Sequence, residues 1–168
     1  MTNDQQVMSE LFIRKAKTWN IVTLVLASIS AVINLFGIPT AINPDVDTFK
    51  EIGASKEYIN YLQSTSVKIF TILGIIISLV LVVLYVMNQM KLAKNQMAPK
   101  FPYYLYIGWS VLNFVVSLMA PKLQVEGMDF GSITLITGIV FKVIFFIPAI
   151  LVIYYLFKAE PEDADEKN

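Results

Sequence analysis

The chain has 168 residues, a length typical of one domain, and its hydrophobic share of 56% exceeds the roughly 45–50% of soluble domains. Its 13 basic and 13 acidic residues cancel, so no net positive charge favours nucleic acid as a partner. The sequence contains neither Cys nor His, which excludes disulfides, thiolate metal sites and every catalytic mechanism that needs an imidazole. We therefore expect a non-enzymatic protein with no catalytic residue, no metal and no cofactor.

Residues 1–18 are predicted to form a helical lead-in to the apolar part of the chain. The stretch "DQQVMSELFIRKAK" places Val7, Met8, Leu11 and Phe12 at helical spacing, with basic residues beyond them. Two interpretations remain open. The segment is either an amphipathic helix lying on anionic lipid or a helical extension of the first membrane span.

Four long apolar stretches predict four membrane-spanning helices. A hydrocarbon core of about 30 Å requires roughly 20 apolar residues in a helix, and an open sheet edge leaves backbone groups unsatisfied in lipid. The first stretch exceeds the apolar core of a cleaved signal peptide, so we expect it to be retained. The stretches cover residues 19–37, 69–87, 103–120 and 132–157. The predicted fold is therefore an all-α integral membrane protein with two helical hairpins, in a transmembrane domain over 19–157.

The distribution of Lys and Arg predicts the orientation of the chain. Cytoplasmic loops carry an excess of these residues. The side that carries the chain termini has Arg14, Lys15, Lys17, Lys91, Lys94, Lys100, Lys158 and Lys167. The opposite side has Lys50, Lys56, Lys68 and Lys122. We expect a multi-pass protein of the cell membrane with both termini in the cytoplasm, and an inner aromatic belt that includes Trp19, Tyr85 and Tyr103.

The loop over 38–68 is the longest segment between predicted spans, and its pattern indicates short helices. Asn43 followed by Pro44 predicts a capped helix start with proline at the first helical position, and Ser55 predicts a second cap. This second helix either packs on the bundle or presents an interaction face to a ligand. The candidate interaction face consists of Tyr58, Ile59 and Leu62.

The C-terminal segment over 158–168 is acidic and contains no aromatic residue. Such a composition predicts a disordered tail, which the orientation above places in the cytoplasm. The tail either docks to another protein or keeps the chain soluble at its end.

Lys142 is the only charged residue in the four predicted spans. A lysine at the bilayer centre costs about 2.5–3.5 kcal/mol, and no predicted span contains Asp or Glu to offset it. One interpretation is that Lys142 lies about one turn inside the outer boundary and extends its ammonium group towards water. The other interpretation is a polar site, or a carboxylate supplied by a partner chain.

Amide and hydroxyl side chains at a similar depth define a candidate polar site in the outer half of the bundle. An ammonium group among such side chains suits an anion or a carboxylate. For each asparagine the alternative is a hydrogen bond between helices. The candidate site consists of Lys142, Asn113, Asn34 and Thr137.

Two functions remain open at this point. The phosphate-binding loop, the dinucleotide-binding glycine motif and metal-spaced clusters are all missing from the sequence. We expect an accessory, scaffold or immunity-type interaction subunit of a membrane assembly. The alternative is a small oligomeric transporter or channel with its site near Lys142. The expected partners are membrane lipids and another membrane protein or a second copy of the chain.

Overall fold

A computed structural model describes residues 3–125 and 128–160 of the chain. The described elements are α1 (Asn3–Phe36), α2 (Ile38–Ile42), α3 (Val46–Glu51), α4 (Lys56–Gln63), α5 (Thr65–Ala93), α6 (Phe101–Met119), β1 (Gln124–Val125), β2 (Met128–Asp129) and α7 (Phe130–Ala159). Four of the helices, α1, α5, α6 and α7, are long and apolar enough to cross a membrane. The predicted helical membrane class is confirmed, and each predicted span lies on one of these helices to within a residue. The predicted acidic tail lies outside the described residues beyond Glu160.

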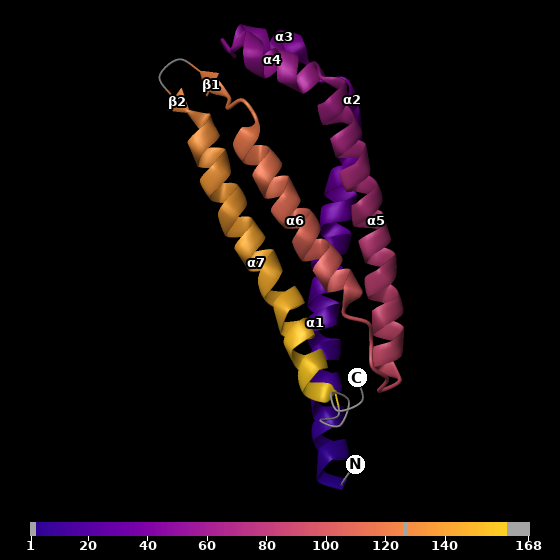
Figure 1. Cartoon of the computed structure of the whole chain (residues 1–168). Coiled ribbons are helices and arrows are strands. Elements are labelled where there is room, and N and C mark those ends of the chain that lie inside the picture. The colour runs from indigo at the N-terminus through magenta and orange to yellow at the C-terminus, as the bar shows by residue number, and fades with distance from the viewer. Residues whose placement is uncertain (1–2, 126–127, 161–168) are drawn as a thin grey trace, which may run out of the picture.

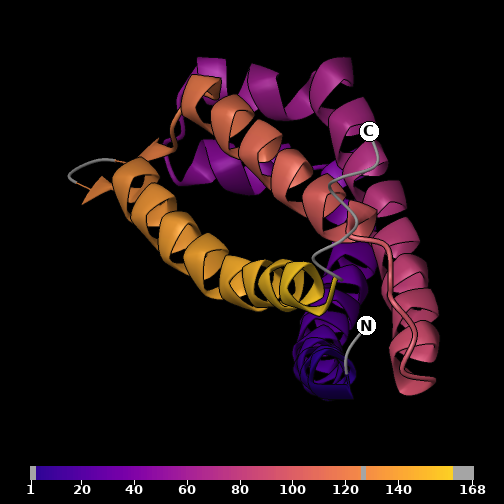
Figure 2. The same cartoon turned by 60° about the horizontal axis from the view of Figure 1, so that its bottom comes forward.

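The four long helices run side by side, with the start of α1 and the end of α7 at one end of the bundle (Figure 1). We call this the terminal end, and we call the opposite end, which carries α2–α4 and the short β1–β2 hairpin, the loop end. Figure 2 shows α1 between α5 and α7, and α1 makes the most extensive contacts with both. The contacts of α6 are much smaller. As a result α5 and α7 diverge towards the loop end (Figure 1).

The buried core lies mainly in the terminal half of the bundle. Small side chains allow membrane helices to approach closely, and Ala16 of α1 and Ala149 of α7 are both fully buried. Larger apolar side chains complete the contact between these helices. The core consists of Ile13, Ala16, Leu81, Tyr85, Leu92, Ala98, Tyr103, Ala149, Val152, Leu156 and Ala159.

The N-terminal lead-in continues the first span without a break, because α1 runs as one helix from Asn3 to Phe36. Its side chains pack on the last turns of α7. The Phe12 ring stacks on that of Tyr155 with centroids 6.3 Å apart, and the Ser9 hydroxyl donates to the Ala159 carbonyl at 2.8 Å. The lead-in is therefore continuous with the first span, and a role for it on anionic lipid stays a prediction.

The short helices of the loop end differ from the prediction in one cap. The predicted start at Asn43–Pro44 is wrong, since α3 begins at Val46 and is capped by Asp45. The Asp45 carboxylate accepts from the Thr48 backbone N–H at 3.3 Å and from its hydroxyl at 2.7 Å. Asn43 instead ends α2. The Ser55 cap is confirmed, because its hydroxyl accepts from the Tyr58 N–H at 3.2 Å.

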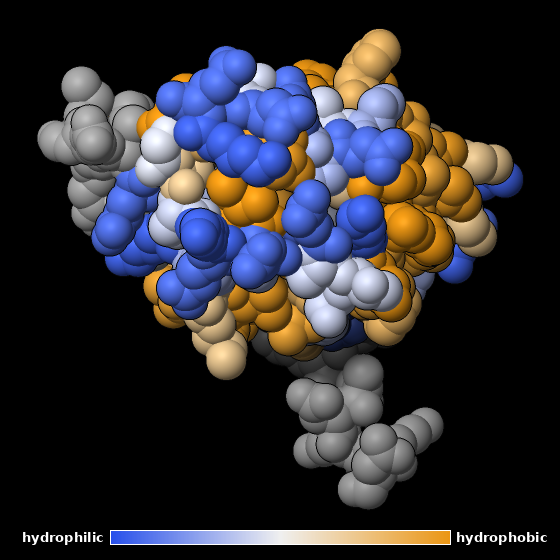
Figure 3. Space-filling view, turned by 90° about the horizontal axis from the view of Figure 1, so that it is seen from above, coloured by the Kyte–Doolittle hydropathy of each residue, from blue (hydrophilic) through white to orange (hydrophobic). Residues whose placement is uncertain are grey.

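Seen from above, the loop end presents a mixed surface. Polar residues cover much of this face, and apolar residues surround them and show between them (Figure 3). The large apolar side chains on the flanks of the long helices are exposed, as expected for surfaces that face lipid. The polar groups of the loop end therefore lie above the apolar flanks of the bundle.

Candidate functional site

Lys142 lines three cavities in the loop-end half of the bundle. The largest, the central vestibule, has a volume of about 660 Å³ and lies between α1, α5, α6 and α7. The loop cavity has a volume of about 390 Å³ and extends from Lys142 to α4 and to the segment after α6. The α6–α7 groove has a volume of about 170 Å³. Lys142 is therefore the residue at which these three spaces meet.

The central vestibule brings together three of the four residues that the sequence placed in a candidate polar site. Asn34, Asn113 and Lys142 all line it. Thr137 does not line it, and its side chain is exposed on α7. The vestibule also has hydroxyl groups that the sequence analysis did not select. They belong to Ser30, Thr71, Ser78, Ser110 and Ser117.

The two asparagines of the vestibule make no described hydrogen bond between helices. Asn113 donates to the Trp109 carbonyl of its own helix at 2.9 Å, and Asn34 is exposed. The helix–helix bridge that the sequence left open for each of them does not occur among the described contacts. Both amides are therefore placed where a molecule entering the vestibule can reach them.

The Lys142 ammonium group has an aromatic neighbour and no described carboxylate beside it. Its Nζ lies 4.9 Å from the centroid of the Phe114 ring, a distance that allows a cation–π interaction. Among the residues that line the three cavities there is no acidic side chain. The described ion pairs, Lys50–Asp47 and Lys100–Glu160, lie elsewhere. Among the described residues, the positive charge of Lys142 therefore has no acidic partner.

A second polar cluster, which the sequence analysis missed, joins helices in the terminal half of the bundle. The Tyr103 hydroxyl donates to Asn20 Oδ1 at 2.7 Å and accepts from Asn88 Nδ2 at 3.2 Å. Asn20 Nδ2 also donates to the Tyr85 carbonyl at 3.1 Å and to Gln89 Oε1 at 2.8 Å. These bonds join α1, α5 and α6. We call Asn20, Asn88, Gln89 and Tyr103 the amide–tyrosine cluster.

The amide–tyrosine cluster corrects the predicted aromatic belt. Tyr85 and Tyr103 are fully buried rather than exposed at a lipid boundary, because buried amides supply hydrogen bonds to the Tyr103 hydroxyl. Asn88 also donates to the Pro99 carbonyl at 2.9 Å and so ties α5 to the segment before α6. The signal in the sequence was Asn20 beside Asn88, two amides at matching depth in neighbouring spans.

The Tyr85 hydroxyl has no hydrogen-bond partner among the described residues, although it is buried. Tyr85 lines a small cavity of about 90 Å³ next to the vestibule. The two cavities adjoin because they share Ser30, Ser78, Leu81 and Tyr106. The small cavity therefore extends the space of the vestibule to Tyr85.

The candidate interaction face of α4 is turned towards the protein. Ile59 is buried, and Tyr58 and Leu62 are half-buried. The Tyr58 ring meets that of Phe49 edge-on at 5.7 Å, and burial, followed by the neighbouring Tyr61, raises the pKa of its phenol. These side chains offer little free surface, so their role towards a partner stays a prediction.

The chemistry available at the Lys142 cavities is that of binding an anion. One ammonium group, amides and hydroxyls can hold negative charge, and among the described residues no group of acidic side chains could hold a metal ion. Comparisons with family models, curated proteins and solved structures found no match. The geometry of the three cavities therefore carries the functional proposal.

Proposed function

We propose that this chain is a non-enzymatic integral membrane protein that acts as an accessory, scaffold or immunity-type subunit of a membrane assembly. It binds another molecule at the loop end through Lys142. The observation that carries this proposal is the Lys142 ammonium group at the junction of three cavities that no described acidic side chain lines. A cation at this depth is stabilised by a negative group, and the spans of this chain supply none.

The arrangement in the cell belongs to the same proposal. The bundle is built from two hairpins in the cell membrane, its termini lie in the cytoplasm, and its loop end faces outside. The support is the excess of Lys and Arg on the terminal side. In this orientation the vestibule opens to the outer side, where an extracellular agent or the outer part of a partner subunit reaches it.

Photo-crosslinking from position 138 tests the proposal in native membranes. Gly138 lines the loop cavity one turn from Lys142, and a side chain added there meets nothing within 4 Å. The Cβ of a photoreactive residue therefore has open space at this position. We expect a specific adduct, identified by mass spectrometry, that disappears in Lys142→Leu and persists in Lys142→Arg.

Gly108 on α6 provides the matched control, because a side chain added there also meets nothing within 4 Å and Gly108 lines none of the three cavities. The same adducts from both positions, or adducts that persist in Lys142→Leu, would refute a binding role for Lys142.

A small oligomeric transporter or channel is the second candidate. The central vestibule is polar at the loop end and stops at the buried core of the terminal half. A cavity closed on one side is what alternating access requires of a transporter. Flux of anions into proteoliposomes tests this candidate, with Lys142→Leu expected to abolish flux and leave the oligomer intact. Absence of flux with the wild-type protein leaves the binding-subunit proposal in place.

A further inference from the structure

We propose that the loop cavity and the α6–α7 groove together bind a phosphate-bearing anionic lipid, with its phosphate between Lys122 and Lys142 and an acyl chain in the groove. The inference rests on the proposed binding function and names the chemical class of the bound molecule. It follows from the depth of the two lysines, the charge of the loop cavity and the apolar lining of the groove.

The two lysines lie at the level of the lipid headgroups on the loop side. α6 has 19 residues and so spans about 28 Å, which is close to the thickness of the hydrocarbon core. Its last residue, Met119, therefore marks the membrane boundary, and Lys122 follows just outside it. Lys142 lies 16 residues before Lys158 on α7, which places it about 24 Å above the inner end and just inside the boundary.

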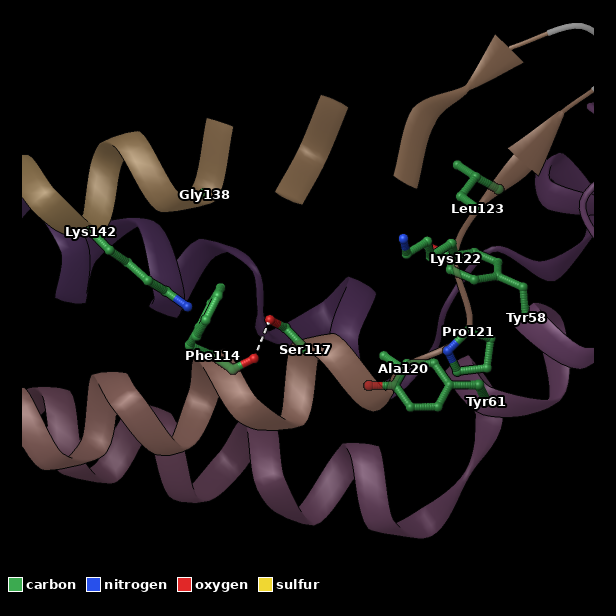
Figure 4. A pocket seen from close by; sticks show the side chains of 10 residues that line it. All are labelled: Tyr58, Tyr61, Phe114, Ser117, Ala120, Pro121, Lys122, Leu123, Gly138 and Lys142. Atoms are coloured by element: carbon green, nitrogen blue, oxygen red, sulfur yellow. Dashed lines mark hydrogen bonds between the residues drawn. The ribbon is translucent and has the colours of Figure 1, made fainter. Parts of the chain in front are cut away.

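The loop cavity has the charge that a phosphate requires. Figure 4 shows the ammonium ends of Lys122 and Lys142 extending from opposite sides into the same cavity. Tyr58, Tyr61 and Ser117 add hydroxyl groups to the lining, and no acidic side chain is among the lining residues that the structure describes. Two ammonium groups without a carboxylate complement a phosphate, which presents several oxygens to donors.

The α6–α7 groove supplies a place for an acyl chain. It shares Phe114 and Lys142 with the loop cavity, so the two spaces meet at the same ammonium group. Apart from Lys142 and Ser110, its lining is apolar: Val111, Phe114, Ile139, Val143 and Phe146. A free phosphate ion does not use such a groove, whereas the membrane presents acyl chains along it. The occupant is therefore a lipid.

Lipid capture in vesicles of defined composition tests the inference. The full chain with a photoreactive residue at Gly138 is reconstituted in phosphatidylglycerol and phosphatidylcholine mixed at about one to three. We expect adducts from position 138 to be enriched in phosphatidylglycerol relative to adducts from position 108. The enrichment should fall about fivefold in Lys142→Gln and again in Lys122→Gln, the factor expected for about 1 kcal/mol per lysine near an anionic surface.

Two controls separate this site from general attraction of anionic lipid. Lys142→Arg should retain the enrichment, and Lys56→Gln with Lys68→Gln should also retain it, since neither lysine lines a cavity described above. Equal lipid ratios at positions 138 and 108, or equal loss in both lysine pairs, would overturn the inference. Lys142-dependent binding of inorganic phosphate to the protein, together with no enrichment of phosphatidylglycerol, would show that a free phosphate is the ligand and would also overturn it.

Failure of this inference is distinguishable from failure of the proposed function. A Lys142-dependent protein adduct in native membranes, together with no lipid enrichment in vesicles, would refute the lipid inference and support the proposed binding subunit. Absence of any Lys142-dependent adduct in either setting would refute both the lipid inference and the proposed binding function.

Discussion

The rings of Tyr85 and Tyr103 stack with centroids 5.3 Å apart, yet their hydroxyl groups differ in hydrogen bonding. The Tyr103 hydroxyl donates to Asn20 and accepts from Asn88, whereas the Tyr85 hydroxyl is buried with no partner in the part of the chain that the structure describes. The pair joins α5 to α6, and α6 has only small contacts with its neighbours. Of these two phenols, that of Tyr103 makes the described hydrogen bonds that join α6 to α1 and α5.

Removing each hydroxyl should accordingly have different effects. Tyr103→Phe leaves Asn20 Oδ1 without the described Tyr103 donor, and we expect it to lower the free energy of unfolding by about 1–2 kcal/mol. Tyr85→Phe removes an unsatisfied hydroxyl and should leave stability within about 0.5 kcal/mol of wild type, or raise it. Unfolding in detergent micelles measures both variants, and equal destabilisation by the two would contradict the described hydrogen bonds.

A second prediction concerns the contact between α1 and α7. Ala149 is fully buried on α7, and a larger side chain there pushes the two helices apart. We expect Ala149→Leu to destabilise the protein by about 1–3 kcal/mol, the usual cost of overpacking. The same change at Ala93, which is exposed at the end of α5, should have little effect. A tolerated Ala149→Leu, measured by the same unfolding assay, would show that α1 and α7 are further apart than described.

Lys142 should matter for binding more than for folding. In the structure its ammonium group has the Phe114 ring as its described contact, and replacement by leucine removes an uncompensated charge from the bundle. We expect Lys142→Leu to insert normally and to be as stable as wild type or slightly more stable. Yield in membranes and thermal unfolding provide the measurement. A misinserted or strongly destabilised variant would mean that Lys142 is a structural residue.

The sequence predicts the spans well because lipid constrains helix length and hydrophobicity strongly. It predicts the approximate site for the same reason, since a charge such as Lys142 is conspicuous in an apolar stretch. It does not predict which helices meet. The contact of α1 with α7 depends on small side chains such as Ala16 and Ala149, and small residues occur on many helix faces without specifying a partner.

The residues that the sequence analysis misplaced also depend on contacts between helices. A tyrosine near the end of a span suits a lipid boundary or a buried hydrogen bond equally well, and only the position of Asn20 opposite Tyr103 decides between them. Thr137 lies within two turns of Lys142 in the sequence, but the direction of its side chain on α7 keeps it out of the vestibule lining. Direction around a helix depends on contacts that a single sequence does not show.

The cap of α3 should respond to acid. The Thr48 hydroxyl, followed by the Thr48 backbone N–H, holds the pKa of the Asp45 carboxyl below its ordinary value of 3.8. Because the folded-state pKa is lowered, the cap contributes fully above about pH 4 and is lost as pH falls through the lowered pKa. The amide proton shift of Thr48 should follow this loss in an NMR titration. The amide of Tyr58, capped by Ser55, should not, and Asp45→Asn should remove the Thr48 response.

Single cysteines should reveal the side of the membrane on which each end of the bundle lies. The chain has no cysteine, so an introduced thiol is the only target for an impermeant maleimide. Lys56 on α4 and Lys94 after α5 are both exposed, at the loop end and the terminal end respectively. We expect Lys56→Cys to be labelled in intact cells and Lys94→Cys only after permeabilisation, because the side richer in Lys and Arg stays in the cytoplasm. The reverse pattern would place the vestibule and Lys142 on the cytoplasmic side, and an extracellular agent would then be excluded as the bound molecule.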